Sequence, residues 1–157
     1  MSNGKIDVKY INPFIVSTVE TFDKMLGIKL QKGTPYLKKK DEHSDITGII
    51  GLSGDAKGII AITFSRITAL KTVSKFLGMK VLSIDDTVAD AVGELINIIA
   101  GNAKQYLKDL KVDISLPKVI IGHSHSVSDL TEIPTIVIPF ESELGQFKIE
   151  VALRESN

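Results

Sequence analysis

The sequence predicts an α+β protein in which helices pack on a mostly antiparallel sheet. Two observations lead to this prediction. Stretches with apolar residues every three or four positions alternate with short apolar runs that are separated by turn-like segments. The order helix, short strand, loop, hairpin also occurs twice, with Pro35 and Pro117 in the two short strands and a helix at residues 66–77 between the halves. We therefore expect pseudo-duplicated helix–strand–hairpin units in one domain spanning residues 1–157.

The composition is that of an ordinary globular protein. The chain has 157 residues, of which 43% are hydrophobic and 24% charged. Lys plus Arg and Asp plus Glu both number 19, so no net charge favours nucleic acid or anionic lipid. Cysteine is absent, which excludes thiol nucleophiles and disulfides. Residues 1–7 lack the apolar core of a signal peptide and no apolar run could span a bilayer, so we expect a cytoplasmic protein without a membrane or nucleic-acid partner.

The first predicted helix covers residues 13–26. Asn12 suits the N-cap, Pro13 suits the first helical position, and Gly27 suits the left-handed residue that follows a helix. The charged stretch at residues 37–42 lacks an apolar face and is predicted to be a solvated loop.

Two further helices are predicted over residues 66–77 and 84–110, from the same spacing of apolar residues. The longer of the two carries the signal discussed below. The expected ends are Ser65 as cap and Gly78 as stop for the shorter helix, and a capping box of Ser83 and Asp86 at the start of the longer one.

Strands are predicted between the helices. Two hairpins are expected, and in the last strand the alternation of apolar and other residues indicates one buried face and one wet or weakly covered face. Pro139 indicates an edge or a bulge. The expected strands are 48–52 with 58–64 around the loop 53–57, 134–140 with 147–153 around 141–146, and the single runs 112–116 and 118–122.

The helix at residues 84–110 has two distinct faces. At about 100° per residue, Val88, Val92, Leu95, Ile99, Ala103, Tyr106 and Leu110 share a wide apolar face that must be core. The opposite face carries a line of residues one above another: Asp90, Glu94, Asn97, Gly101, Lys104 and Lys108.

Two members of that polar line are poor choices for helix stability. Gly101 costs roughly 1 kcal/mol relative to Ala and Asn97 roughly 0.5 kcal/mol. One interpretation is a face shaped for docking, where the glycine lets another surface approach. The alternatives are a merely solvated face, or a helix that ends at Gly101-Asn102 and is followed by a separate helix at 103–110.

Other candidate clusters are weaker. His123 and His125 have the spacing of one strand face, but only Asp129 is near and no Cys completes a metal site, so a surface loop is expected. The Gly-rich stretch 51–58 lacks the Lys-Ser/Thr of a phosphate-binding loop and is read as a hairpin turn. Lys38–Lys40 lacks interleaved aromatics and is not read as a nucleic-acid site. No metal site and no Ser–His–Asp arrangement is predicted.

The polar line of the long helix resembles the motif of the CheC/CheX/FliY family of bacterial chemotaxis proteins. That motif is Asp or Ser, three residues, Glu, two residues, Asn, and a Pro further along, matched here by Asp90, Glu94, Asn97 and Pro117. Nineteen residues separate Asn97 from Pro117, fewer than in the family's pattern. The resemblance implies a CheC-like fold and covers nearly the whole chain; residues 8–15, 48–54, 92–104 and 137–141 carry it, and most resemble the CheX members.

This resemblance implies a phosphatase that dephosphorylates the phosphorylated response regulator CheY in two-component chemotaxis signalling. The implied roles suit the chemistry. Asn97 would orient the attacking water, since phosphoryl transfer mainly needs positioning and charge stabilisation. Glu94 would pair with a cation of the partner and fix how it docks. Asp90 and Lys104 would be flanking contacts, and Gly101 would give clearance.

The resemblance also carries expectations about the number of sites, cofactors and assembly. The first helix offers Glu20 and Asp23 in place of the family's Glu and Asn, so one active face per chain is expected. No cofactor of the chain's own is expected, because Mg²⁺ would sit on the partner regulator. A homodimer is implied. The alternative to an enzyme is a non-enzymatic module that binds a receiver domain or a flagellar switch component through the same helix face.

Overall fold

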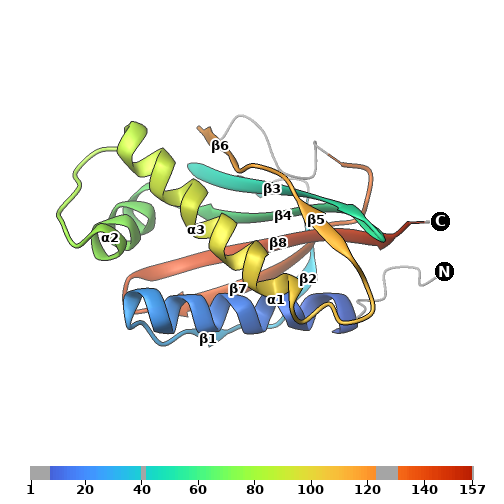
Figure 1. Cartoon of the computed structure of the whole chain (residues 1–157). Coiled ribbons are helices and arrows are strands. Elements are labelled where there is room, and N and C mark those ends of the chain that lie inside the picture. The colour runs from blue at the N-terminus through green and yellow to red at the C-terminus, as the bar shows by residue number, and fades with distance from the viewer. Residues whose placement is uncertain (1–7, 40–41, 123–130, 157) are drawn as a thin grey trace.

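The computed structural model describes residues 8–39, 42–122 and 131–156. Figure 1 shows the helices packed on one face of a curved antiparallel sheet, as the α+β prediction requires. The elements in chain order are α1 Val8–Thr21, a π-helical turn η1 Phe22–Leu26, β1 Gln31–Lys32, β2 Tyr36–Leu37, β3 Ile46–Gly54, β4 Ala56–Phe64, α2 Arg66–Leu77, α3 Asp86–Lys104, β5 Val112–Ile114, β6 Lys118–Ile121, β7 Ile136–Ser142 and β8 Gly145–Glu155.

The strand order confirms the predicted duplication. The sheet runs β1-β7-β8-β4-β3-β5, with β2 also pairing β7 and β6 also pairing β3. Each half therefore contributes a hairpin to the centre and a pair of short strands that border the other half's hairpin. All pairings between the described strands are antiparallel, and β4 joins the two halves by pairing over its whole length with β8 from Phe147 to Glu155.

Both hairpins are confirmed; β3, β4 and β8 are longer than predicted, and β7 has the predicted length but lies two residues later. β3 and β4 continue to a tight turn at Asp55, so most of the expected loop 53–57 belongs to strands. Pro139 lies where the neighbouring strand is interrupted: β1 ends at Lys32, β2 starts at Tyr36, and only the Gly33 N–H reaches the Pro139 carbonyl, at 2.8 Å. The missing proline donor therefore faces a gap in the ladder.

Of the three helices, α2 has the predicted bounds and caps. The Ser65 hydroxyl accepts from the Thr68 N–H, and Gly78 has φ 67°. The first helix was predicted to begin too late. α1 starts at Val8 and Pro13 lies inside it, because Ile11 is buried in the core and that burial outweighs the backbone bond that the proline removes. Gly27 is left-handed, as expected.

The core lies between the helices and the sheet. Phenylalanines from both halves meet there, with the Phe22 and Phe147 rings stacked at 4.6 Å and Phe140 and Phe64 at 5.3 and 5.5 Å from Phe147. Such ring pairs add to the burial of large apolar surface. This cluster fixes η1 on the sheet, and the buried side chains of α3 pack into the same core.

The other face of the sheet corrects two predictions. The prediction of a solvated loop at residues 37–42 is wrong at Lys38, because the Lys38 Nζ pairs with the Glu150 carboxylate at 2.6 Å and both side chains are buried. The face of β8 that carries Glu150 is therefore covered, not wet. The pKa of Glu150 is raised, because burial raises it by more than the Lys38 ammonium lowers it. The alternation of residues placed Glu150 on that face, but it could not show that a distant lysine covers it.

A second polar cluster on this face involves Glu42. Its carboxylate accepts from the Lys148 Nζ at 2.9 Å, from the Tyr36 hydroxyl and from the Lys39 N–H. Burial opposes the ionisation of Glu42, but these hydrogen bonds outweigh it and lower its pKa to about 2.

Candidate functional site

The candidate site lies on α3, an unbroken helix from Asp86 to Lys104. Its cap differs from the prediction: the Asp85 carboxylate, not Ser83, accepts from the Val88 N–H at 3.1 Å. The helix also ends earlier than Leu110. The prediction that Tyr106 and Leu110 continue its apolar face is thus wrong, since turns follow Lys104.

Close packing holds α3 in place. A Cβ added at Gly48 of β3 would lie 3.0 Å from a methyl of Val92 and 3.1 Å from one of Ile96, so the glycine lets the helix approach the sheet. On the α1 side, the buried Ser17 hydroxyl donates to the Ile99 carbonyl at 2.5 Å. The apolar face predicted to be core is buried at Val88, Val92, Leu95, Ile99 and Ala103.

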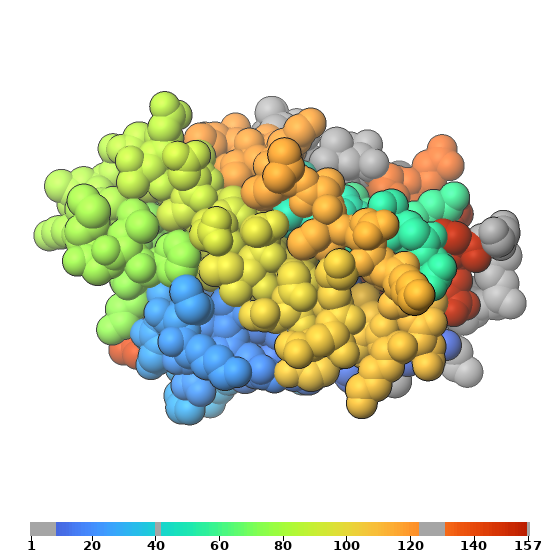
Figure 2. All heavy atoms as spheres, viewed as in Figure 1, coloured from blue at the N-terminus to red at the C-terminus, as the bar shows by residue number. Residues whose placement is uncertain are grey.

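The polar line of α3 faces outward, as predicted. Asp90, Glu94, Gly101 and Lys104 are exposed and Asn97 is half-buried. The helix continues through Gly101-Asn102, so the alternative in which it ends there is wrong. Glu94 and Asn97 lie one turn apart, with Cβ atoms about 5–6 Å from each other. An acid and an amide therefore project side by side from one continuous helix. Figure 2 shows the yellow atoms of this helix at the surface of the molecule.

These polar side chains have no structural partner within the described part of the chain. No hydrogen bond or ion pair involves the side chain of Asp90, Glu94, Asn97 or Lys104 there. Exposed polar groups without such bonds can exchange water for a partner's groups without breaking the fold. Gly101 adds clearance, because a Cβ built on it meets no atom within 4 Å.

Pro117, the residue that completes the motif, lies against the same helix. A Cβ added at Gly93 would be 3.6 Å from the Pro117 ring and 3.4 Å from Val119. Gly93 directly precedes Glu94 in the chain and lies one turn before Asn97. The structure therefore brings Pro117 beside the site despite its shorter sequence spacing. In Figure 1 the segment between β5 and β6 runs along α3.

The equivalent helix of the first half carries no comparable site. Glu20 of α1 accepts from the Tyr106 hydroxyl at 2.5 Å and pairs with Lys24 at 3.5 Å. The hydrogen bond to Glu20 raises the pKa of Tyr106. Glu20 therefore ties α1 to the turn after α3, and a single active face per chain stays a prediction.

The remaining sequence candidates add no second site among the residues that the structure describes. The Gly-rich stretch 51–58 forms the adjoining ends of β3 and β4 and the tight turn at Asp55, so the predicted hairpin is confirmed but most of the stretch is strand. His123, His125 and Asp129 lie outside the described residues. Across residues 8–39, 42–122 and 131–156, no group of three metal-binding side chains is found. Within the same ranges, no helix is long and apolar enough to cross a bilayer.

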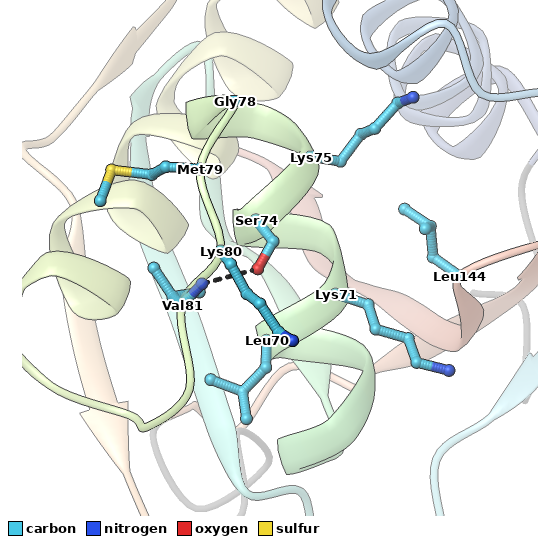
Figure 3. A pocket seen from close by; sticks show the side chains of 9 residues that line it. All are labelled: Leu70, Lys71, Ser74, Lys75, Gly78, Met79, Lys80, Val81 and Leu144. Atoms are coloured by element: carbon cyan, nitrogen blue, oxygen red, sulfur yellow. Dashed lines mark hydrogen bonds between the residues drawn. The ribbon is translucent and has the colours of Figure 1, made fainter.

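A pocket of about 560 Å³ lies away from the polar line, at the end of α2 (Figure 3). Its lining is largely apolar with three lysines, and the Ser74 hydroxyl that accepts from the Val81 N–H is already used within the fold. Lys71 and Lys75 extend in different directions in Figure 3. No acid or amide lines this pocket, so the arrangement suited to phosphoryl chemistry is on α3.

Comparison with solved structures defines the class of protein. The chain is similar to a CheC-like superfamily protein from Shewanella, with a TM-score of 0.85, 36% identity, and coverage of 95% of this chain and 99% of that one. It is also similar to the CheX of the CheX–CheY–BeF3–Mg²⁺ complex from Borrelia burgdorferi, with a TM-score of 0.82, 29% identity, and coverage of 96% and 100%. These are CheC-like proteins, and this chain has their fold.

Sequence comparisons define the family within that class. A family model described as chemotaxis phosphatase CheX matches residues 46–141, which include all of α3. The CheY-P phosphatase CheX of Thermotoga maritima is 34% identical over 143 residues, covering 88% of this chain and 92% of that protein. This chain belongs to the chemotaxis phosphatase CheX family.

Proposed function

We propose that the chain is a phosphatase that removes the phosphoryl group from a phosphorylated CheY-type response regulator. The observation that carries this proposal is the pair Glu94 and Asn97, which projects one turn apart from an unbroken helix and has no structural partner in the described part of the chain. The relative from Thermotoga maritima is a CheY-P phosphatase. The relative from Borrelia burgdorferi was crystallised with CheY, BeF3 and Mg²⁺.

Asn97 is the proposed catalytic residue. An aspartyl phosphate is already reactive, so hydrolysis mainly requires that a water is held in line with the breaking P–O bond. The carboxamide oxygen of Asn97 can accept a hydrogen bond from that water, while its NH₂ donates toward a phosphoryl oxygen. A roughly hundredfold acceleration corresponds to about 2.7 kcal/mol, which one well-placed carboxamide can supply.

Glu94 is the proposed docking residue. Its carboxylate would be repelled by a phosphoryl group, so its role is to pair with a cation of the regulator and set the position of Asn97. Asp90 and Lys104 flank the pair on the same exposed face, and Gly101 leaves room for the partner. In this proposal the regulator brings its own Mg²⁺ and the chain supplies no metal ligand.

The test measures the decay of a phosphorylated CheY-type regulator with catalytic amounts of the protein. Asn97→Ala is expected to keep the fold and the binding of the BeF3-treated regulator, but to lower the hydrolysis rate about a hundredfold. Glu94→Gln is expected to weaken binding as well. Asn102→Ala is the matched control, because Asn102 is exposed on the same helix and points about 140° away from Asn97.

The outcomes separate the enzyme from a binding module. Saturable binding with an unchanged decay rate would establish the non-enzymatic alternative. If several regulators show no binding and no faster decay, both the enzyme and the binding module are refuted. The single domain over residues 1–157, the cytoplasmic location and the homodimer stay predictions, of which the last is measured by sedimentation equilibrium.

A further inference from the structure

An exposed leucine lies at the edge of the candidate site. Leu116 is 88% exposed, the highest value among the large hydrophobic side chains of residues 8–39, 42–122 and 131–156. A single exposed leucine is common on protein surfaces and means little alone. Two features distinguish Leu116: the hydrogen bonds that hold its backbone, and its position beside the candidate site.

The backbone around Leu116 is held firmly. The Ser115 N–H donates to the Gly51 carbonyl at 2.9 Å, and the Gly51 N–H donates to the Ser115 hydroxyl at 2.8 Å. The same hydroxyl donates to the Leu116 carbonyl at 3.0 Å. On the other side, the Pro117 ring packs next to Gly93. An apolar side chain on such a fixed turn binds a partner with little loss of backbone entropy.

The position of Leu116 places it within reach of whatever covers Asn97. Gly93 is about 6 Å along the helix from Asn97, Pro117 packs beside Gly93, and Leu116 adjoins Pro117. A typical interface buries about 800 Å² on each partner, a patch that extends about 16 Å from its centre. Leu116 therefore lies within the area that an interface of this size, centred on Asn97, would span.

We propose that Leu116 is an apolar docking residue for the phosphorylated response regulator, and that it contacts an apolar surface beside the regulator's phosphoaspartate. The inference rests on the proposed function for the identity of the partner. Glu94 supplies a charged contact on one side of Asn97, and Leu116 adds apolar burial on the side of the β5–β6 segment. Charge pairing sets orientation, and the apolar contact slows dissociation.

The experiment compares Leu116→Ser, Leu116→Met and the control Leu37→Ser. Leu37 is also a partly exposed leucine, at 41%, but it lies on β2 at the opposite edge of the sheet. Binding of the BeF3-treated regulator is measured by titration calorimetry, and steady-state hydrolysis gives kcat and KM. Leu116→Ser is expected to raise Kd and KM ten- to hundredfold with kcat within twofold of wild type. Leu116→Met and Leu37→Ser should stay within threefold of wild type.

The results distinguish this inference from the proposed function. Wild-type binding without hydrolysis, together with weaker binding by Leu116→Ser, would support the docking residue while refuting the phosphatase. If the wild-type protein binds and hydrolyses the regulator and Leu116→Ser changes neither, the docking role of Leu116 is overturned and the proposed function stands. A drop in the kcat of Leu116→Ser with constant KM would overturn the docking role as well. A regulator that does not bind the wild-type protein at all would refute both. Circular dichroism and the Tm of each variant confirm that the exposed substitution leaves the fold intact.

Discussion

Replacing Gly101 should separate the stability of α3 from its use. Gly101 lies three residues before the end of the helix at Lys104, and a Cβ built on it meets nothing within 4 Å. A glycine inside a helix costs up to about 1 kcal/mol relative to alanine, and somewhat less near a fraying end. Gly101→Ala should therefore raise the free energy of unfolding by about 0.5–1 kcal/mol, which for a chain of 157 residues raises Tm by about 1–4 °C.

A larger side chain at position 101 should impair function, because in the proposed function the open space is clearance for the regulator. Gly101→Gln keeps the helical preference but fills that space, and we expect kcat/KM for the phosphorylated regulator to fall at least tenfold while Tm stays at or above the wild-type value. Thermal unfolding and regulator dephosphorylation are measured on the same preparations. Asn102→Gln is the neighbouring control and should leave kcat/KM unchanged.

Two results would refute this reasoning. A Gly101→Gln protein with wild-type kcat/KM would show that nothing approaches the helix there. A lower Tm for Gly101→Ala would show that the position is not open. Gly48→Ala provides the contrast, because its Cβ would lie only 3.0 Å from a methyl of Val92 and 3.1 Å from one of Ile96, and it should lower Tm instead.

Three further predictions concern the scaffold. Lys38→Met leaves the buried Glu150 carboxylate without its cation and should lower the free energy of unfolding, measured by urea denaturation, by about 3–5 kcal/mol. The double variant that also carries Glu150→Leu should recover most of this loss, and no recovery would contradict the pairing. The pKa of Glu42 is lowered from 4.5 to about 2, so its pairing with Lys148 stabilises the fold above about pH 5 and is lost as the pH falls toward 2. Glu42→Gln should flatten this part of the profile of unfolding free energy against pH, and an unchanged profile would refute the stabilising role of the Glu42 carboxylate. Ser65→Ala removes the α2 cap and should cost about 1 kcal/mol, read from Tm, whereas Ser65→Gly should cost only a few tenths.

Local patterns predicted most of this fold. Ser65 and Gly78 mark both ends of α2 because capping depends on nearby backbone groups. The alternating residues of the last strand located β8. The start of α1 was missed because Pro13 is a good first residue by local rules, whereas burial of Ile11 depends on the whole core. The cover over Glu150 was missed because its partner is distant in the sequence.

Local patterns also predicted the helix face that carries the candidate site, but not the contacts that distant parts of the chain make with it. Glu94, Asn97 and Gly101 lie on one helix, so their common face follows from helical periodicity alone. The neighbourhood of Pro117 and Leu116 depends on how β5 and β6 pair with β3 and approach α3, which no local pattern determines. The part of the site built from one element was therefore accessible from the sequence, and the part built from several was not.

The seam between β4 and β8, which runs from Ala56 opposite Glu155 to Phe64 opposite Phe147, makes the two halves interdependent. Each half ends its own hairpin with an edge that only the other half covers, and each borders its partner's hairpin with short strands. A chain severed in the loop between Gly78 and Asp85 would give two fragments that fold by complementation, neither being stable by itself. The regulator dephosphorylation that we propose for α3 would then report directly on reassembly, since this helix is supported by residues of both fragments.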